Sequence, residues 1–564
     1  MKNTLTKRIA ALFVSVLLLL ALAACGDNGG SSGSTNDAQR SSGTDSSEAT
    51  ADTGADETEM EETTINIRVM NEFLNLDKVL AAYEEMVADD PKLSKIKLNF
   101  SFVAGGDYKD KLTMALVGQE DYDLMFCGGW HGLTQFIQEG NFKELSGYFN
   151  NDAFPGLQSA FSEDFISAMT SYIRQEDGAY LEGIYGVNLA TFFEDTRGYM
   201  YREDLRKKYK LPEITDDESL FNYVKTVSES ETDLIPVGLS NFFRMYTPWY
   251  AGKHEGIFAQ DSTNLFGDQT WLYVGLSDDQ KTVLNAVVAG DSEAEFAKLP
   301  DGYQTDFISA YLQERTKWNP YLSSTRGSTD TTEAEMDALI AYSTLTEYEG
   351  RVTEKLNAHP DWAFGFYAID DAQRNMEEGA VVCDMVTNNW LVVPEWSEKT
   401  DAVMSFLDWM FGSQEANDLF SYGIMGDDWN AVGENGYELL NVESESRYAM
   451  PSYSLTQNPS YIRYSQFVLD NEDIKERFDY MYDKNTYELS PFSGFIFDAS
   501  AVETEIANIS ALSNELQLSV SLYDEAELAE KISAWHEKAE SVGLEKVREE
   551  LISQLQAFID AKNA

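Results

Sequence analysis

The 564-residue chain is poor in cysteine, histidine and basic side chains, and each shortage excludes a class of function. It has three cysteines and four histidines, and the histidines are scattered along the chain. No His-Glu-x-x-His motif is present, so a catalytic zinc site has little support. Only 41 residues are lysine or arginine against 97 aspartates and glutamates, which leaves a formal net charge of −56. Because nucleic-acid binding depends on cationic contacts to phosphates, this charge argues against a nucleic-acid partner.

Sequence motifs for nucleotide binding and covalent catalysis are also missing. The phosphate loop G-x-x-x-x-G-K-[ST] does not occur, so no nucleotide site is expected. Residues 29–33 match the hydrolase string G-x-S-x-G, but they lie in a Gly- and Ser-rich segment that cannot hold the strained turn this motif needs. Paired carboxylates for glycoside hydrolysis stay open. Asp427 and Asp428 could bind Ca²⁺, although no D-x-[DN]-x-[DN]-G loop is present and a solvated surface is the commoner explanation.

The one long apolar run of the chain, residues 9–24, follows three basic residues and has the layout of a secretory signal. It is too short to span a bilayer comfortably, and no other run is long enough to do so. Leu22–Cys25 resembles the lipobox of bacterial lipoproteins, in which the cysteine becomes an N-terminus that carries acyl chains such as palmitate. We expect a signal peptide over residues 1–24 and lipid attachment at Cys25, on the extracellular face of the cytoplasmic membrane. The alternative is an ordinary signal peptide with a cysteine near its end.

Residues 25–62 consist mostly of small, polar and acidic residues with little to bury, so we expect a disordered acidic tether. A coil of about 37 residues has an r.m.s. reach of roughly 35 Å, enough to lift a domain off a lipid surface. The remaining chain of roughly 500 residues is too long for one core and predicts two or three domains. Cys127 and Cys383 stay in the mature chain, where one disulfide is possible but two buried thiols are the commoner outcome.

From residue 64 onward the apolar residues alternate between strand and helix patterns. Expected strands lie at 64–70, 96–103, 122–126, 381–386 and 390–393, and expected helices at 76–87, 108–117, 133–139 and 403–411. Strands separated by helices form βαβ units and a parallel sheet, in which ligands lie beyond the carboxyl ends of the strands. Trp130 and His131 follow the third strand, so they lie at such an end. The C-terminal segment predicts three helices, with Asp524 and Glu527 as a capping box.

Several stretches, in this order, resemble the extracellular solute-binding proteins (family 1, carbohydrate type) of bacterial ABC importers. The similarity covers the family's third strand with its ligand turn and helix, the strand after the first lobe crossing, and the return strand with its helix. These stretches are 123–126, 130–145, 199–205 and 390–409. Residues 423–429 and 495–560 are similar to a subgroup of longer lipoprotein binders with an added helical C-terminal region. The resemblance covers nearly all of the chain from about residue 64.

The resemblance implies an α/β fold of two lobes, the type II periplasmic-binding-protein-like fold, with parallel-rich sheets flanked by helices and a helical C-terminal region. It implies that the solute binds between the lobes, that the lobes close by hinge motion, and that the closed form docks on a membrane permease. Crossings between the lobes are expected near Asp195, near 383–388 and after Phe411. The implied segments are 63–195 with about 386–412 for lobe 1, about 196–385 with about 413–490 for lobe 2, and 491–564 for the C-terminal region.

A sugar site needs flat aromatic surfaces for the ring faces and planar, bidentate polar groups for the hydroxyls. Trp130 is the main candidate for stacking, with His131 beside it. Further candidates implied by the resemblance are Asp195 with its neighbour Glu194 at the first crossing, and Asn388, Asn389 and Trp390 on the return strand. Weaker candidates are Arg197, Arg244, Trp249 and Trp429. A long insertion at about 250–360 leaves the contacts from the second lobe open.

These observations predict a lipid-anchored extracellular receptor that captures a sugar or oligosaccharide and delivers it to the permease subunits of an ABC importer. We expect a monomer without enzyme activity, cofactor, metal or nucleic-acid partner. Its acidity mildly favours a neutral or cationic solute. A surface carbohydrate-active enzyme such as a glycosidase and a structural or adhesive lipoprotein stay open as alternatives. Peptides and other oligomeric solutes also stay open, because a cleft between two lobes is not specific for sugars.

Overall fold

The computed structural model describes most of the chain from residue 62 onward. The described ranges are 62–175, 177–189, 195–237, 257–259, 272–322, 338–383, 389–442, 444–451, 455, 458–516 and 523–563. The predicted signal peptide, the lipid site at Cys25 and the predicted tether up to residue 61 lie outside the described residues. Within the described ranges, no helix combines the length and apolarity that crossing a bilayer requires.

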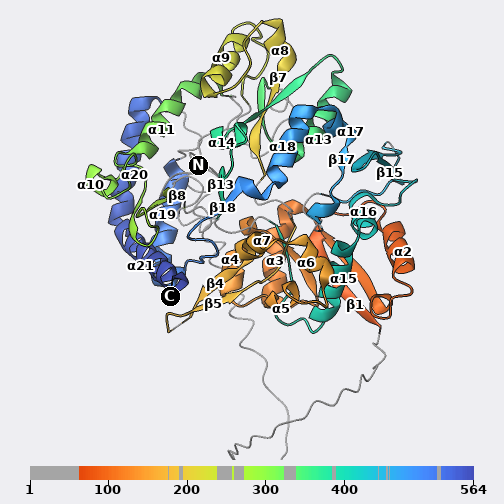
Figure 1. The fold of residues 1–564 in the computed structure, drawn as a ribbon. Coiled ribbons are helices and arrows are strands. Elements are labelled where there is room, and N and C mark those ends of the chain that lie inside the picture. The colour runs from red at the N-terminus through yellow and green to blue at the C-terminus, as the bar shows by residue number, and fades with distance from the viewer. Residues whose placement is uncertain are drawn as a thin grey trace, which may run out of the picture. The chain divides into compact units, whose positions relative to one another are not determined.

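In the described part of the chain, the first sheet has the strand order β2-β1-β3-β14-β6. Its strands are β1 (Thr63–Met70), β2 (Ile96–Val103), β3 (Leu124–Cys127), β6 (Val187–Asn188) and β14 (Trp390–Val392). Figure 1 labels one strand of this sheet, β1, in orange-red. β1 pairs in parallel with both β2 and β3, as the alternation of strands and helices predicts. β14 comes from far along the chain and pairs antiparallel with β3 and β6. The return strand is therefore built into the N-terminal sheet.

Helices cover this sheet, because their apolar positions recur every three or four residues and form one buried face. In α15, Val403, Phe406 and Leu407 are all fully buried. α15 also lies directly against α6, where a Cβ atom on Gly156 would come within 2.0 Å of the backbone oxygen of Asp408. A larger residue at this position would therefore push the two helices apart. The helices of this part are α2 (Leu76–Met86), α3 (Gly105–Gly118), α4 (Leu133–Gln138), α5 (Ser146–Phe149), α6 (Pro155–Ala160), α7 (Glu163–Met169), α15 (Thr400–Gly412) and α16 (Gln414–Tyr422).

A second sheet has β7 (Arg197–Arg202) at its centre, between β11 (Ile340–Thr344) and β12 (Phe364–Ala368). Both pairings are antiparallel, which differs from the expected parallel pairing. The physical reason is that β11 and β12 run in the same direction, joined by the crossover helix α13 (Leu345–Ala358), while β7 is inserted between them. The other helices of this part are α8 (Glu203–Lys208), α9 (Asp217–Ser228), α14 (Asp371–Arg374), α17 (Gln466–Asp470) and α18 (Glu472–Tyr482).

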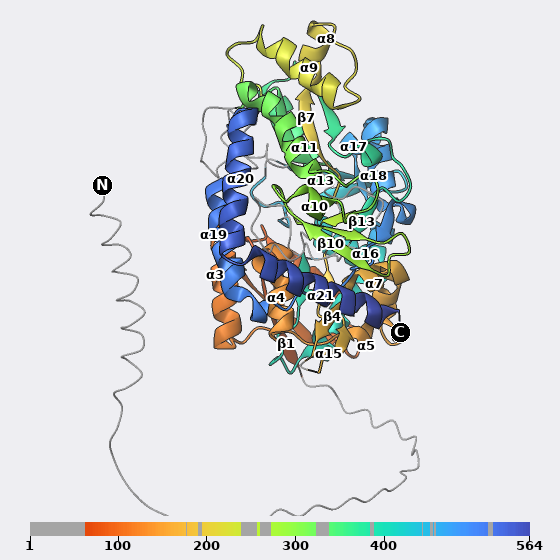
Figure 2. The ribbon, with the colours of Figure 1, turned by 90° about the vertical axis from the view of Figure 1, so that its left-hand side faces the viewer.

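The third part combines a small antiparallel sheet with the C-terminal helices (Figure 2). The sheet consists of β8 (Ile257–Ala259), β9 (Tyr273–Leu276) and β10 (Val283–Val287), and the helices are α10 (Glu293–Phe296), α11 (Phe307–Arg315), α19 (Glu503–Leu516), α20 (Glu525–Ser541) and α21 (Leu544–Lys562). α21 packs against β10 and α20 packs against α11. The expected C-terminal helices are thus present, and Asp524 caps the N-terminus of α20 by accepting a hydrogen bond from the amide of Glu527.

Short strand pairs connect these parts. They are β4 (Ser171–Arg174) with β5 (Tyr180–Gly183), β13 (Val381–Cys383) with β18 (Tyr487–Leu489), and β16 (Gly436–Leu439) with β15 (Trp429–Val432) and β17 (Tyr464–Ser465). Buried apolar side chains form a first core around the first sheet, a second core that is shared by one side of the second sheet and the third part, and a smaller core beneath α13. Leu419 and Phe420 of α16 belong to the first core. Cys127 and Cys383 are both buried thiols, and no disulfide joins them. The lobe boundaries themselves stay predictions.

Asp428 joins two segments of the first part that are far apart in the sequence. Its buried carboxylate accepts hydrogen bonds from the Lys78 ammonium at 2.6 Å and from the amides of Tyr448 at 2.7 Å and Ile424 at 2.8 Å. Burial alone would raise the pKa of Asp428, but these donors hold it below its usual value. A solvated surface is therefore the wrong explanation for Asp428, because its oxygens are occupied by fixed donors. It does describe the exposed Asp427, which also contacts Lys78.

We expect Asp428→Asn to lower the free energy of unfolding by about 2–4 kcal/mol, because it leaves a lysine and backbone amides with a weaker acceptor in a buried place. Urea unfolding followed by tryptophan fluorescence measures the change. Asp427→Asn is the matched control, since it removes an exposed partner of the same lysine and should cost less than about 1 kcal/mol. Equal effects of the two substitutions would contradict this assignment.

The depressed pKa of Asp428 also predicts the direction of a pH dependence. Its contribution to stability is present above the pKa of the unfolded chain, about 3.9, and is lost as the pH falls through the lower pKa of the folded chain. The stability difference between the native chain and Asp428→Asn should therefore narrow as the pH falls below about 4. Melting temperatures of both proteins along a pH series measure this difference. A difference in melting temperature between the two proteins that stays constant or widens as the pH falls would contradict the prediction.

Candidate functional site

Trp130 lies at the carboxyl end of β3, where the first sheet gives way to a short turn. β3 ends at Cys127, and the turn that follows is one 3₁₀ segment, Gly129–His131, before α4 begins. Because β14 runs antiparallel to β3, its first residue, Trp390, pairs with Cys127, and the preceding residue, Asn389, lies at the same edge. The Trp130 indole Nε1–H donates to Asn389 Oδ1 at 3.3 Å. The structure therefore brings together two predicted site residues that are distant in sequence.

The side chain of Trp130 is 53% exposed, which is unusual for so large an apolar group in a part of the chain with an ample core. One face of its ring is supported by the imidazole of His131, whose centroid lies 3.8 Å away. The hydrogen bond to Asn389 restrains rotation of the indole. Trp130 is thus a supported aromatic surface open to solvent, which is the form of group that stacks on a sugar ring.

His131 is only 2% exposed and supports Trp130 from beneath. Its Nδ1 accepts a hydrogen bond from the amide of Gly128 at 3.1 Å, so the neutral ring carries its proton on Nε2, which has no hydrogen-bond partner within the described chain. The rings of Tyr108 and Phe126 enclose the imidazole at 5.2 and 5.5 Å. Burial, helped by Lys109, lowers the pKa of His131 to about 4. His131 is therefore buried against the Trp130 ring and does not offer the surface that the predicted direct contact with solute requires.

Trp390 occupies the core and not the surface where the sequence analysis expected it. Its side chain is 0% exposed, and it packs so closely over Gly186 that a Cβ atom there would lie 2.8 Å from the indole ring. The reason is the alternation of side chains along a strand. Asn389 reaches the edge beside Trp130, and the next residue turns its side chain into the sheet's core. Trp429 is also buried, and its Nε1–H donates to the backbone oxygen of Gly423 at 3.1 Å.

Asp195 and Arg197 lie at the end of the second sheet where the chain enters it. Asp195 accepts hydrogen bonds from the hydroxyl and, at 3.4 Å, the amide of Thr346 in the first turn of α13. This contact caps the helix and uses a carboxylate where the helix dipole favours one. Arg197 begins β7 opposite Thr344, and its backbone oxygen accepts from the amide of Ile369 at 2.9 Å. β7 therefore starts at the same edge where β11 and β12 end.

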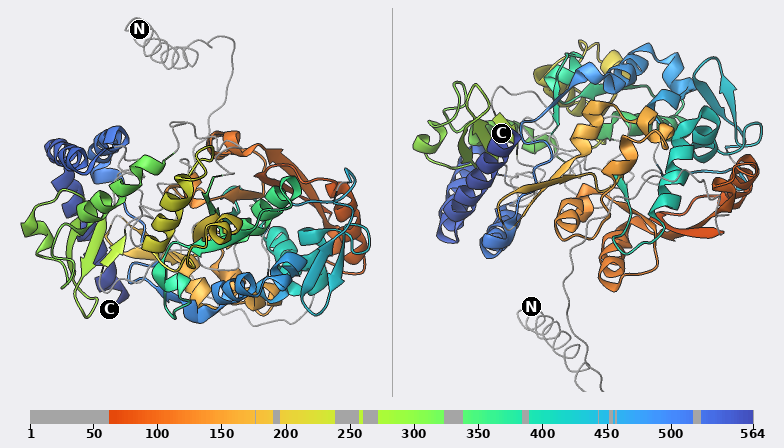
Figure 3. Two further views of the ribbon diagram at one scale, coloured as in Figure 1. Left: turned by 90° about the horizontal axis from the view of Figure 1, so that it is seen from above. Right: turned by 60° about the horizontal axis from the view of Figure 1, so that its bottom comes forward.

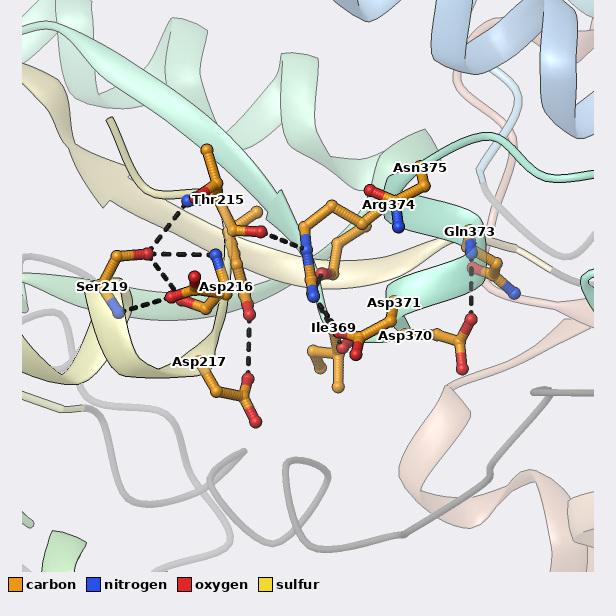
Figure 4. A network of polar contacts seen from close by, with 12 residues as sticks. Thr215, Asp216, Asp217, Ser219, Ile369, Asp370, Asp371, Gln373, Arg374 and Asn375 are labelled. Carbon is orange, nitrogen blue, oxygen red and sulfur yellow. Dashed lines mark hydrogen bonds and ion pairs between the residues drawn. The ribbon is translucent and has the colours of Figure 1, made fainter. Parts of the chain in front are cut away.

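The residues after β12 form a polar group at this edge that the sequence analysis missed (Figure 4). Asp370 caps α14 by accepting from the amide of Gln373 at 2.9 Å, and burial raises the pKa of Asp370. Arg374 donates to the backbone oxygens of Ala368 at 2.7 Å and Thr215 at 2.9 Å. It also forms an ion pair with the exposed carboxylate of Asp371. An alternating strand followed by two aspartates was the sequence signal that could have revealed this group.

Asp217 fixes the neighbouring start of α9 to the same network. Its Oδ1 accepts from the Tyr367 hydroxyl at 2.8 Å, and its Oδ2 pairs with the Arg315 guanidinium at 2.6 Å. Burial opposes ionisation here, but Arg315 and Tyr367 hold the pKa of Asp217 below its usual value. The second sheet thus ends in a rigid set of paired charges, of which Asp371 is the exposed acid.

Four other predicted site residues cannot be assessed from the structure. Asn388, Trp249, Arg244 and Glu194 lie outside the described residues. Away from the two sheet edges, Asp291, His536 and Glu540 place three possible metal-ligand atoms close together. Both oxygens of Asp291 are already used, Oδ1 by His536 and by Arg548 at 2.7 Å each and Oδ2 by the amide of Val288 at 2.8 Å. A guanidinium on the same oxygen repels a cation, so this cluster is better explained as an ion-pair network.

The geometry defines an α/β protein with an aromatic surface at one sheet edge and paired charges at another. Residues 75–417 match the model of the bacterial extracellular solute-binding protein family, and residues 491–560 match a domain of unknown function, DUF3502. The first match spans more than half of the chain. The chain therefore belongs to the bacterial extracellular solute-binding protein family.

Individual relatives agree with this family. A carbohydrate ABC transporter substrate-binding protein of Streptococcus pneumoniae is 24% identical over 177 residues, which are 30% of this chain and 32% of the relative. The chain thus matches about a third of that relative's length. The crystal structure of the N-glycan transport solute-binding protein of S. pneumoniae has a TM-score of 0.65 at 17% identity, covering 88% of this chain and 99% of that one. An HMO-binding, ABC-transporter-associated solute-binding protein of Bifidobacterium longum infantis has a TM-score of 0.54 at 12% identity, covering 89% of this chain and 99% of that one. These likenesses show the two-lobed solute-binding fold.

The buried environment of His131 makes a testable prediction about its ionisation. We expect the imidazole to stay neutral down to a pKa of about 4, because protonation would place a charge among aromatic rings. NMR titration of histidine-labelled protein, with His131→Gln to assign the signal, measures this value. Below about pH 6.5 the unfolded chain binds this proton and the folded chain does not, so the residue should favour unfolding increasingly as the pH falls towards 4. A measured pKa at or above 6 would contradict the assigned environment.

Proposed function

We propose that this solute-binding protein is the receptor of an ABC importer for a sugar or oligosaccharide. The observation that carries the proposal is the exposed ring of Trp130, held from beneath by His131 and from the side by Asn389. A flat, fixed indole stacks on the weakly apolar face of a pyranose without losing further conformational freedom. The amide of Asn389 lies beside it, where an amide can exchange hydrogen bonds with sugar hydroxyls.

The second lobe supplies the polar side of the site in this proposal. Asp195, Arg197 and Asp371 lie at the edge of the second sheet where the chain enters from the first. Carboxylates and a guanidinium form bidentate hydrogen bonds with neighbouring hydroxyls of a sugar ring. Asp371 is the best placed of these residues, since its carboxylate is exposed and Arg374 already orients it. The similar proteins include a carbohydrate ABC transporter substrate-binding protein and an N-glycan transport solute-binding protein, which supports the same solute class.

We propose the lobes as follows. Lobe 1 comprises residues 63–195 and about 386–412, extended to about residue 455 because Leu419, Phe420 and Tyr448 pack in the first core. Lobe 2 comprises about 196–385 and the later residues up to about 490, and the C-terminal region comprises 491–564. Closure of the lobes about the crossing segments would bring the Trp130 edge and the Asp371 edge onto one solute.

The anchor and the partners of the chain also belong to this proposal. We propose that Cys25 carries the lipid, that residues 25–62 form the tether, and that the monomeric receptor works on the outer face of the cytoplasmic membrane. A tethered receptor meets its permease at a high effective concentration, whereas a free receptor must find it by diffusion. A glycosidase is the second candidate. Because the family consists of solute-binding proteins, this candidate rests only on the abundance of carboxylates in the chain. Release of reducing ends from a glycan would favour that candidate.

The main experiment measures sugar binding by the unlipidated chain that lacks residues 1–25. Thermal-shift and calorimetric titrations with mono- and oligosaccharides should show stabilisation that grows with ligand concentration by mass action. Short peptides form the comparison set. If peptides stabilise the protein and no sugar does, the proposed solute class is wrong. If no solute of either class binds, a structural or adhesive role gains support.

Trp130→Ala should weaken binding of the sugar by about 10–100-fold, because loss of a stacked ring removes about 1.5–3 kcal/mol. Trp396→Ala is the matched control. Trp396 lies beyond the other end of β14, where its Nε1–H donates to the backbone oxygen of Glu120 at 2.9 Å. This control should bind sugar as the native chain does. Similar losses in both variants would remove Trp130 from the site.

Asp371→Asn should weaken binding by about 3–10-fold, because the amide is a poorer acceptor for hydroxyl groups than the carboxylate. Asp473→Asn is its control, since Asp473 forms a comparable exposed ion pair with Arg477 on α18. Isothermal titration with the sugar identified above measures both. An unchanged affinity of Asp371→Asn would exclude this residue from the second-lobe contacts.

A further inference from the structure

The hairpin β4–β5 has two faces that belong to different cores. Ile173 is buried in the first core, while Tyr172 and Tyr180 pack against the second. The antiparallel register pairs Tyr172 with Glu182 and Arg174 with Tyr180, so these four side chains share one face, and Ile173 lies on the other. A hairpin that continues from the first part of the chain therefore has one face directed to the C-terminal region, where Tyr180 bonds Gln554. In the right-hand view of Figure 3 the yellow-orange ribbon of this hairpin lies beside the dark blue C-terminal helices.

The face of α21 that receives the hairpin has a regular spacing. Glu550, Gln554, Phe558 and Lys562 follow each other at intervals of four residues and so form one stripe along the helix. The rings of Tyr172 and Tyr180 lie edge-on to Phe558 at 5.2 and 5.5 Å. The side chains of Glu550, Phe558 and Lys562 in this stripe contact the hairpin, and Gln554 contacts it through its backbone oxygen.

Polar contacts join the same two surfaces. The Tyr180 hydroxyl donates to the backbone oxygen of Gln554 at 3.2 Å, and Arg174 Nη1 lies 3.9 Å from Glu550 Oε1. The Lys562 ammonium lies 5.5 Å from the centroid of the Tyr172 ring. Burial lowers the pKa of Lys562. We call this contact between β4–β5 and the stripe of α21 the seam.

The chain segment that leads into the C-terminal helices strengthens the seam, because it also contacts the β4–β5 hairpin. The amide of Tyr172 donates to the backbone oxygen of Gly494 at 2.9 Å. Gly494 has a φ of +81°, and a Cβ atom there would come within 2.2 Å of the backbone oxygen of Thr170. Ile496 then packs in the first core, whereas its neighbours Phe495 and Phe497 pack in the second. This segment is thus close-packed between the two cores.

The other side of α21 is fixed to the second core. Leu551 and Leu555 are fully buried there, and the helix packs on β10. Arg548 of α21 pairs with Asp291 at 2.7 Å, and both side chains are almost completely buried. Removing one partner of such a pair is strongly destabilising, so α21 cannot leave the second core easily. One helix therefore joins the second core on one side and a first-core hairpin on the other.

We infer that the C-terminal region matched by the domain of unknown function, residues 491–560, is a brace between the two lobes. It limits how far and how often the lobes move apart or together, because any such movement must open or shear the seam. If only the crossing segments joined the lobes, a few backbone torsions in those segments would control the movement. The brace adds aromatic packing and hydrogen bonds between the β4–β5 hairpin and α21. The link from this restraint to solute affinity rests on the proposed function, since a shift in lobe populations changes apparent affinity.

The test measures lobe movement without any solute. Spin labels are attached to Val117→Cys on α3 and Lys207→Cys on α8, positions whose side chains are exposed. The full mature chain is used with Cys25→Ser, and the buried thiols of Cys127 and Cys383 do not compete for label. Pulsed electron paramagnetic resonance then gives the distribution of distances between the two labels.

Tyr180→Ala with Glu550→Ala weakens the seam without touching the interior of either core. We expect a distance distribution at least about 1.5 times wider than in the native chain, and about tenfold faster amide exchange in β4–β5. The control combines Tyr303→Ala with Glu549→Ala, which removes a tyrosine of the second core away from the hairpin and the exposed acid adjacent to Glu550. It should leave both readouts unchanged. An unchanged width in the seam variant, or equal widening in the control, would overturn the brace.

Sugar titration of the same variants separates this inference from the proposed function. If the seam variant widens the distribution and its affinity for the sugar changes by about threefold or more, both stand. If the distribution widens but no sugar binds even to the native chain, the brace stands and the sugar receptor does not. If sugar binds the native chain and the width does not change in the seam variant, the receptor stands and the brace is wrong.

Discussion

β14 enters the first sheet antiparallel to β3, so the first residue of one strand lies opposite the last residue of the other. This pairing brings Asn389 to the turn that carries Trp130 and turns Trp390 into the core. It also requires the chain to leave the first sheet, build the second, and return. The aromatic surface at the sheet edge, the proposed crossings and the separation into cores all depend on this one strand pairing.

Some of the few cations of this acidic chain pair with fully buried carboxylates. Lys78 pairs with Asp428 at 2.6 Å, and Arg548 pairs with Asp291 at 2.7 Å. A buried carboxylate without such a donor would take up a proton or destabilise the fold. With 41 basic residues against 97 acidic ones, more than half of the acids cannot pair one-to-one with a basic side chain, and they supply the negative net charge. Asp371 stays exposed, and its ion pair with Arg374 orients its carboxylate.

The C-terminal helices show which features the periodicity of apolar residues predicts and which it does not. Their stripes of apolar residues predict three amphipathic helices, and the helices form at those places. The same stripes do not say which surfaces the helices contact. α21 uses two faces, one for β10 and one for the hairpin β4–β5, and only the second face contains Glu550 and Gln554 among its contacts. Polar residues at regular spacing look like a solvated face until their partner is known.

Local patterns in the sequence by themselves determined most of the strands and helices around the first sheet, the C-terminal helices, the place of Trp130 after a strand, and, through resemblance, the solute-binding family. These features depend on residues close together in the chain. Only the tertiary structure decided that Trp390 is core and Asn389 is not, that Asp428 is buried, and that the exposed Asp371 follows β12 at the edge where β7 begins. Each of these depends on strand register and on pairing between segments far apart in sequence, which composition and periodicity do not specify.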